Sequence, residues 1–354
     1  MSDDSTPLIV QYLYVHQPGE DFYYPSVRTS SSIAAVAERY LECALTQVAS
    51  LRLGDVACEL ALATNVDDRS VLGRAGRALL ERIEALGVEI IPTAYVHRPA
   101  DNGANYVSSR YVLDAILSAG AAQPPDRQLW LTDLDCVWAD AGRVFAATPP
   151  APEVGCVFIG YAPDEQSGIS DEGGTRRSLG ELAETMGAPQ QEMPSWVGGE
   201  LLTGTCESLR HLVEACERID AQLAERKKAL AAEEEILSLV GALGLVRFRN
   251  LGDVAARIGT GPRNVAWRPD DPSAFGLWHL PSEKGLSLRR AARQVLAGRE
   301  ASLRRDLADS GRLARRFNVL GTGLGRRLRD DGWIAAQRLR DTGRSFASRK
   351  SGVR

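Results

Sequence analysis

Two aspartates spaced two residues apart are the strongest candidates for chemistry in this chain. Asp133 and Asp135 follow the apolar run 129–131 and precede a second apolar run, 136–138. Within a strand such carboxylates point to opposite sides, but where the chain turns at a strand's carboxyl end both can approach one cation or phosphate. Open α/β sheets bind ligands at that edge. Because roughly one Asp-x-Asp is expected by chance in a chain this long, its surroundings must decide its meaning.

A histidine and a lysine late in the chain could complete a site around this pair. His279 lies in the strand-like run 274–280, and Lys284 follows five residues later. Carboxylate oxygens suit Mg²⁺ and Mn²⁺, and Mn²⁺ also accepts imidazole. Taken alone, the two residues are typical of a core-edge histidine and a solvated charge. Beside the Asp pair they indicate a site for a divalent cation and a diphosphate, whose charge Lys284 would help to neutralise.

The elements that must position these residues alternate between strands and helices. We predict strands at 8–15, 56–64, 88–92 and 129–132, and helices at 33–48, up to Leu86, and at 108–118. Such alternation implies an α/β fold in which a mostly parallel sheet is flanked by helices on both faces. The Asp pair therefore ends about the fourth strand.

Beyond residue 150 the alternation loosens. Strands are predicted at 154–159, 196–204 and 245–248, and helices at 207–228 and 231–242. The polar stretch 163–194 is interpreted as an excursion with one short helix, a candidate lid. Within the strand at 196–204, the adjacent glycines 198 and 199 mark a place where another group approaches the backbone closely.

Composition bounds the class of protein. The 354 residues are 44% hydrophobic and 25% charged, which is typical of a globular protein of one large or two ordinary domains. No apolar run approaches the ~20 residues that a membrane helix needs. The acidic N-terminal segment 1–7 does not resemble a signal peptide. Six cysteines without Cys-x-x-Cys spacing indicate reduced core residues, so we expect a cytoplasmic protein.

The charge is divided unevenly along the chain. Residues 286–354 carry 18 basic and 6 acidic side chains, whereas the remainder carries 24 basic and 40 acidic ones. Apolar residues at helical spacing separate the arginines, a pattern typical of amphipathic helices on anionic membrane surfaces. A solvated, partly disordered tail is the alternative. We expect no nucleic-acid partner, because the acidic body would repel a phosphate backbone.

The order of the motifs resembles the nucleotide-sugar glycosyltransferases of the GT-A fold. Leu-Thr-Asp-Leu-Asp at 131–135, Trp-Val-Gly-Gly-Glu at 196–200, an acidic helix start at 233–235 and His-x4-Lys-Gly at 279–285 carry the resemblance. It covers roughly residues 8–285 and implies a Rossmann-like sheet. The domains would be 1–285, the transferase, and 286–354, the basic helical tail. The activity implied is hexosyl transfer from a UDP-sugar to a hydroxyl of a glycan, lipid-linked saccharide, secondary metabolite or other small molecule.

The resemblance also implies roles around the donor. Asp133 and Asp135 match the motif that holds Mn²⁺ or Mg²⁺ and touches the ribose and diphosphate; we expect Asp135 to be the better metal ligand and Asp133 the partner of the ribose. His279 is similar to the late histidine that completes the metal shell in the family 8, glycogenin-like branch. Lys284 is similar to its lysine, although the usual His-x2-Gly-x2-Lys spacing is one residue longer.

Further residues are implied at the donor and acceptor. Asn65, at the end of the second strand, and Arg110, in the helix before the Asp strand, match positions near the donor. The acceptor side would comprise the segment around Gly199 with the aromatic, acidic and catalytic candidates Trp196, Glu200 and Glu234. Without the resemblance, Glu200 is equally an ordinary strand-edge charge, Arg110 a surface arginine, and the acidic run a helix start favoured by its dipole.

Two other functions fit parts of the sequence. In an aspartyl-phosphate hydrolase of the haloacid dehalogenase type, Asp133 would be the nucleophile, and 133–137 matches the Asp-x-Asp-x-Val form of that motif. That class also needs a later acidic pair after a strand, and 270–271 follows a poor strand end. A non-catalytic sugar-nucleotide-binding module is the other alternative. Under the transferase hypothesis, the basic tail would hold the protein peripherally on the inner face of the cell membrane.

Overall fold

A seven-stranded sheet forms the centre of the protein. The structure is a computed structural model that describes residues 6–17, 20, 32–99, 107–159, 175–188, 194–230, 232–260 and 269–320. The strands of the sheet are β1 (Leu8–Leu13), β2 (Glu59–Thr64), β3 (Val88–Pro92), β4 (Gln128–Thr132), β6 (Val154–Phe158), β7 (Val197–Thr205) and β8 (Phe248–Asn250). Their order is β3-β2-β1-β4-β7-β6-β8. The four strands from β3 to β4 are mutually parallel, and β7 runs antiparallel to both β4 and β6.

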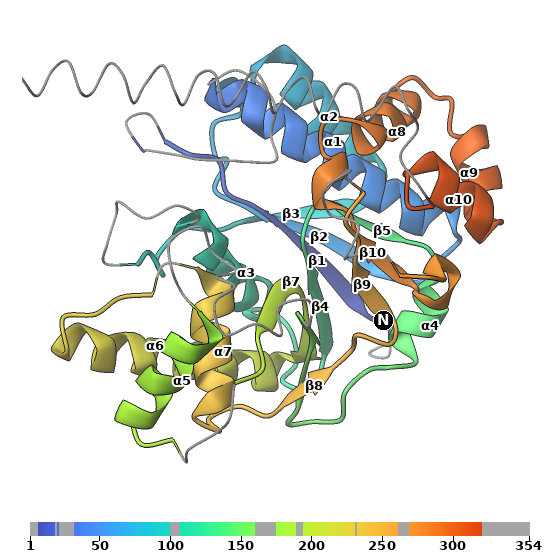
Figure 1. Ribbon diagram of the computed structural model, residues 1–354. Coiled ribbons are helices and arrows are strands. Elements are labelled where there is room, and N and C mark those ends of the chain that lie inside the picture. The colour runs from blue at the N-terminus through green and yellow to red at the C-terminus, as the bar shows by residue number, and fades with distance from the viewer. Residues whose placement is uncertain are drawn as a thin grey trace, which may run out of the picture.

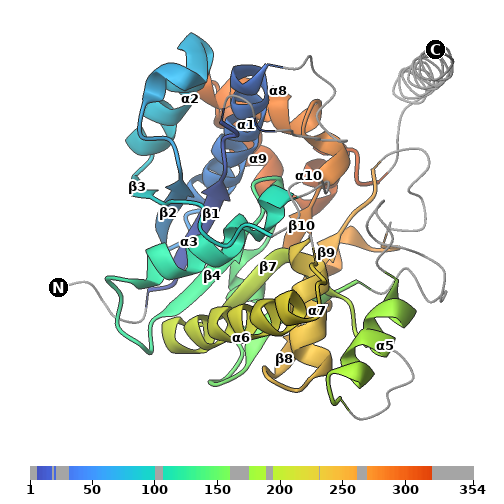
Figure 2. The same cartoon turned by 90° about the vertical axis from the view of Figure 1, so that its left-hand side faces the viewer.

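Helices cover both faces of this sheet, as the sequence predicts (Figures 1 and 2). They are α1 (Ile33–Leu53), α2 (Gly73–Ala85), α3 (Tyr111–Gly120), α4 (Ala141–Phe145), α5 (Arg176–Thr185), α6 (Cys206–Glu225), α7 (Glu233–Ala242), α8 (Ser287–Leu296), α9 (Ala301–Leu307) and α10 (Ser310–Arg316). The alternation of side chains along β1 separates two apolar cores. Ile9 packs with α1, α2 and α8, whereas Leu8 and Val10 pack with α3 and α6 on the other face.

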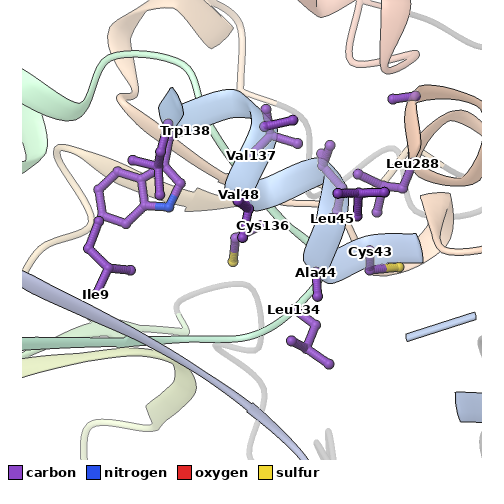
Figure 3. Packing of buried hydrophobic residues seen from close by; sticks show 14 of the residues in the cluster. Ile9, Cys43, Ala44, Leu45, Val48, Leu134, Cys136, Val137, Trp138 and Leu288 are labelled. Atoms are coloured by element: carbon purple, nitrogen blue, oxygen red, sulfur yellow. The ribbon is translucent and has the colours of Figure 1, made fainter. Parts of the chain in front are cut away.

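A second, three-stranded sheet stands beside the Asp pair. It comprises β5 (Cys136–Trp138), β10 (Leu277–His279) and β9 (Ala255–Arg257), in the order β5-β10-β9. Figure 3 shows Val137 and Cys136 packed beside Val48 and Leu45 of α1, with Leu288 of α8 near them. The apolar residues that follow the Asp pair in sequence therefore anchor this sheet against α1.

Helices α8, α9 and α10 correct one expectation about the basic tail. Leu288, Leu303, Leu313 and Phe317 are fully buried and belong to the same core as α1. The apolar stripe of the tail therefore packs on the protein as far as Val319, so this part of it is not free to enter a bilayer as the amphipathic pattern suggested. Residues 321–354 lie outside the described residues, and the domain boundary at 285/286 stays a prediction.

Most other predicted elements agree with the structure, but the strand predicted at 245–248 lies instead at Phe248–Asn250, as β8. The strand at 88–92 is confirmed residue for residue, and the Asp pair does follow the fourth strand of the chain. The stretch 163–194 contains one short helix, α5, but 160–174 and 189–193 lie outside the described residues, so the lid stays a prediction. All six cysteines are buried and free. Among the helices that the structure describes, none is both long and apolar enough to cross a membrane.

Candidate active site

The site lies where the order in which the chain adds strands to the sheet reverses. From β1 the chain adds β2 and β3 on one side, and then crosses to add β4 on the other. Loops at the carboxyl ends of β1 and β4 therefore diverge, which leaves room for a ligand between them. Tyr12, near the end of β1, donates a hydrogen bond of 2.5 Å to Oδ1 of Asp133, the first residue after β4. The Asp pair thus stands at the topological switch point.

The structure brings the three predicted metal ligands together. Nε2 of His279 lies 3.1 Å from Oδ2 of Asp135 and 3.4 Å from Oδ2 of Asp133. One ligand atom from each residue can be chosen so that all three lie within 4.8 Å of one another. The Asp135 side chain is 2% exposed, whereas that of Asp133 is 32% exposed. Asp133 therefore borders the open side of the site.

Backbone pairing fixes this convergence. Strand β10 is antiparallel to β5, and its register sets His279 opposite Cys136, the residue after Asp135. One residue further, the amide of Leu280 donates to the carbonyl oxygen of Asp135 at 2.9 Å. A pair of strands of three residues each is therefore enough to hold His279, which comes late in the chain, against the Asp pair.

Lys284 is held in the same site. Its Nζ lies 3.0 Å from Oδ2 of Asp135 and 5.4 Å from the centre of the Tyr40 ring. The preceding residue, Glu283, is fully buried and accepts hydrogen bonds from Thr260 at 2.5 Å and from Asn318 at 3.1 Å. These bonds fix the turn that delivers Lys284, even though its spacing from His279 departs from the family pattern.

Burial and charge act against each other at this site. Burial opposes ionisation of Asp135, but Lys284 and His279 outweigh it and hold the pKa of Asp135 below its usual range. Burial likewise disfavours the charged forms of the two basic groups, yet the pKa of Lys284 is raised because Asp135 faces it. The pKa of His279 is raised by Asp135 and, more weakly, by Asp133. The cluster is therefore an array of buried charges that depend on one another.

This donor set fits a divalent cation. Oδ2 of Asp135 and both ring nitrogens of His279 are buried, and apart from the ion pairs that join Asp135 to His279 and Lys284 they have no hydrogen bond of good geometry within the described part of the chain. Buried polar atoms without such partners are uncommon in proteins and indicate that another group completes them. Two carboxylates and one imidazole suit Mn²⁺, and the oxygens suit Mg²⁺. A cation bound here would displace any proton on Nε2 of His279.

The glycines before Glu200 make room for two carboxylates. A Cβ atom at Gly198 would collide with the Glu200 carboxylate, and one at Gly199 would lie 2.6 Å from Oε1 of Glu233. Both acidic side chains therefore fold against the bare backbone of β7. Burial raises the pKa of Glu200, and the positive charges of Arg257 and His279 offset only part of this increase. Burial, together with the neighbouring Glu234, raises the pKa of Glu233 to about 8.

Glu200 also borders the metal ligands directly. Strand β7 is antiparallel to β4, and the carbonyl oxygen of Glu200 accepts a hydrogen bond of 3.1 Å from the amide of Asp133. Its Oε1 lies 3.9 Å from Nδ1 of His279, and neither carboxylate oxygen has a hydrogen bond within the described residues. The structure thus places the predicted catalytic carboxylate beside the predicted metal site.

Trp196 and Glu234 are joined to each other. The indole Nε1 of Trp196 donates to Oε2 of Glu234 at 3.2 Å, and Arg257 donates to Oε1 of the same carboxylate at 2.9 Å. Trp196 is 1% exposed, so its ring is part of the core rather than a free surface for an acceptor. Glu234 is held in place by both donors, and its acceptor role stays a prediction.

Two predicted donor residues have their polar groups engaged elsewhere. The Asn65 side chain accepts from the amide of Val15 at 2.7 Å and donates to its carbonyl oxygen at 2.8 Å, which ties β2 to the segment after β1. Arg110 is 1% exposed and donates to Asp220 of α6 at 2.5 Å. Arg110 therefore ties the start of α3 to α6, and Asn65 shapes the switch-point loop through backbone contacts.

Sequence analysis missed three residues that support the site. Tyr12 binds Asp133, Glu283 anchors the lysine turn, and Arg257 binds Glu234. The position of Glu283 directly before Lys284 was the one signal that the sequence offered for it. Tyr12 lies more than a hundred residues from Asp133, and only the β1–β4 pairing brings the two together. No local pattern in the sequence marks such a contact.

Comparison with known proteins gives a likeness of shape only. No protein-family model matches the chain, and no curated protein matches it significantly. Among solved structures, an active-site mutant of LgtC aligns with 82% of this chain and 95% of its own, at 12% identity and a TM-score of 0.49. The structure of the galactosyltransferase LgtC with donor and acceptor sugar analogues aligns with the same shares of both chains, at 12% identity and a TM-score of 0.45. Mouse xyloside xylosyltransferase 1 aligns with 77% of this chain and 96% of its own, at 14% identity and a TM-score of 0.44.

Proposed function

We propose that this chain is a metal-dependent glycosyltransferase. It would move a hexosyl group from a nucleoside-diphosphate sugar, a UDP-sugar by the family resemblance, to an acceptor hydroxyl. The observation that carries the proposal is the convergence of Asp133, Asp135 and His279 within 4.8 Å at the switch point of the sheet, with Lys284 beside them. That edge is where open α/β sheets bind nucleotides.

Each residue has a distinct task at the donor. Asp135 and His279 would hold the cation from the buried side, and Asp133 would hold it from the open side while accepting a hydrogen bond from the ribose. A bound Mn²⁺ or Mg²⁺ supplies a Lewis acid that stabilises the departing diphosphate. Lys284 adds a fixed positive charge in a water-poor setting, where its interaction with phosphate oxygens is strong.

The acceptor side centres on Glu200. A buried carboxylate without a hydrogen bond among the described residues is free to accept one from an acceptor hydroxyl, which aligns that hydroxyl for attack. The glycines at 198 and 199 let this carboxylate and that of Glu233 lie flat against β7. A glycan, a lipid-linked saccharide or a small molecule could supply the hydroxyl.

The phosphatase alternative finds no support in the structure. The acidic pair that it requires would be Asp270 and Asp271, and Asp271 is exposed and caps a short helix by accepting from the amide of Ser273 at 2.9 Å. The charged side chains that form ion pairs with the Asp pair are those of His279 and Lys284, which belong to a different segment. This arrangement favours binding of a diphosphate over formation of an aspartyl phosphate.

The test is a donor screen with a matched pair of variants. The purified chain is incubated with nucleotide sugars and Mn²⁺, and products are identified by mass. The parent is expected to transfer or hydrolyse at least one donor, and Asp135→Asn to do so at least about a hundredfold more slowly. Asp126→Asn, a change on an exposed turn, should match the parent.

Three results would contradict the proposal. Equal rates in Asp135→Asn and the parent would remove the metal site from the reaction. Binding of UDP without any turnover would point to the non-catalytic module instead. Magnesium-dependent release of phosphate from an aryl phosphate, lost in Asp133→Asn, would point to the phosphatase.

A further inference from the structure

Helices α8 and α9 follow one another in the chain (Figure 1), and residues of both and of the turn between them line a basic cavity. Its volume is about 800 Å³, which is within the range of small-molecule sites. It shares no lining residue with the metal and diphosphate site. The polar side chains that line it are Arg289, Arg290, Arg293, Gln294, Arg299 and Ser302.

The sequence of α8 explains how the arginines gather. Arg289, Arg290 and Arg293 lie one and three residues apart, a spacing that places them on one side of a helix. The opposite side carries the buried core residues of α8. After the helix ends, Gly298 adopts a φ of 67°, which turns the chain back and brings Arg299 to the same cavity.

One buried carboxylate serves several of these cations. Glu42 of α1 is 2% exposed, and its Oε1 lies 3.2 Å from Nε of Arg289 and 3.4 Å from Nε of Arg293. Its other oxygen accepts from Arg39 at 2.6 Å. Glu42 therefore fixes the orientation of two lining guanidinium groups but supplies only one negative charge for three positive ones.

The remaining cations of the cavity lack a carboxylate. Neither Arg290 nor Arg299 forms an ion pair within the described part of the chain, and the nearest acid in sequence, Glu300, binds Arg82 at 2.5 Å. Arg316 of α10 binds Asp306 at 2.9 Å; burial and the nearby Arg290 both lower its pKa. Positive charges held this close repel one another, and an anion between them would relieve the repulsion.

We propose that this cavity binds a phosphate-bearing anion. Guanidinium groups match phosphate oxygens in paired, bidentate hydrogen bonds, and fixed arginines lose little freedom on binding. The anion is either a soluble phosphate compound or the head group of an anionic lipid, because both present the same chemistry. This proposal does not depend on the transferase activity.

The test measures pyrophosphate binding by calorimetry to the full chain, in the presence of a chelator so that no divalent cation occupies the other site. The variant Arg290→Ala/Arg299→Ala is compared with the parent. The control Arg305→Ala/Arg315→Ala removes the same charge from exposed positions outside the cavity. All four side chains are exposed, so folding should be retained; Arg290→Gln/Arg299→Gln provides a second variant of similar size.

We expect the cavity variants to bind at least about tenfold more weakly than the parent, and the control to bind as the parent does. A parallel arm measures co-sedimentation with phosphatidylcholine vesicles, with and without phosphatidylglycerol. If the cavity variants lose pyrophosphate binding, the ligand is a soluble phosphate compound. If they lose only co-sedimentation with the vesicles that contain phosphatidylglycerol, the ligand is a lipid head group. Absence of both interactions in the parent, or equal losses in cavity and control variants, would overturn the proposal.

Discussion

The hydroxyl group of Tyr12, near the end of β1, donates a 2.5 Å hydrogen bond to Asp133, which follows the neighbouring strand β4. The same hydroxyl lies 3.3 Å from the carbonyl oxygen of Gly199, so it joins the predicted metal ligand Asp133 to β7, the strand of the proposed acceptor side. Groups that hold a ligating carboxylate in one orientation raise its affinity for metal. Tyr12 is therefore a positioning residue of the site.

Tyr12→Phe should weaken cation binding without unfolding the protein. We expect the affinity for Mn²⁺, measured by calorimetry, to fall about tenfold, because Asp133 loses the bond that orients it. Tyr111→Phe is the control, since it removes another buried hydroxyl bond, a 2.8 Å contact with Thr93. If both variants bind Mn²⁺ as the parent does, Tyr12 does not orient the site.

Gly199→Ala tests the account of the adjacent glycines. Its Cβ atom would lie 2.6 Å from Oε1 of Glu233, so the carboxylate must leave its place against β7. We expect turnover to fall about tenfold or more, because displacement of a site group by about 1 Å is already costly. Gly204→Ala, on the same strand with no contact closer than 3.4 Å, should keep the parent's rate. Equal rates in the two variants would show that the bare backbone is not needed.

Leu288→Ala tests whether α8 belongs to the core. The Leu288 side chain is fully buried beside α1, so its truncation leaves a cavity and should lower the free energy of unfolding by about 2–4 kcal/mol. Leu296→Ala, in the same helix but 42% exposed, should change it by less than about 0.5 kcal/mol. Urea denaturation measures both. A Leu288→Ala value as small as that of Leu296→Ala would show that the helix is peripheral.

His97 predicts a pH dependence of stability. Its Nδ1 lies 2.6 Å from Asp114 of α3 and its Nε2 lies 3.0 Å from Glu217 of α6. These two partners raise its pKa, Asp114 most strongly, against the opposing effect of burial. A raised pKa in the folded state means that the stabilisation is fully present below the unfolded pKa of about 6.5 and is lost as pH rises through the folded value.

The measurement is thermal unfolding of the parent and of His97→Asn over a range of pH. The variant should be less stable by about 1–2 kcal/mol in mildly acidic solution, and the difference should shrink as pH rises. His211→Asn, an exposed position on α6, should follow the parent throughout. A difference that grows with pH would reverse the assigned sign.

The sequence predicted the sheet and the position of the Asp pair because both depend on local patterns, and the family resemblance added His279, which the structure places beside that pair. Alternating strands and helices place Asp133 and Asp135 at a strand end, and only a few residue types can complete a cation site with them. The contact of Tyr12 with Asp133 was not predictable, because it depends on strand order. The roles given to Arg110 and Asn65 follow positions in a family, and here their polar groups bind Asp220 and Val15.

The tail shows a different limit. An apolar stripe such as that of α8 has the same spacing whether it packs on a membrane or on another helix, so periodicity cannot choose between them. The choice depends on the partner surface, which α1 provides in the folded chain. What the arginines of α8 face is equally a tertiary property, and it turns a predicted charged tail into a candidate anion site.

Binding of UDP with and without Mn²⁺ tests the central claim most directly. Calorimetry on the parent should show binding that requires Mn²⁺ and disappears with a chelator, because in the proposed function Asp133, Asp135 and His279 would hold the cation that the diphosphate contacts. Asp135→Asn should lose both Mn²⁺ and UDP binding, whereas Asp126→Asn should retain both. UDP binding that is equally strong without a divalent cation, or unchanged in Asp135→Asn, would contradict the account.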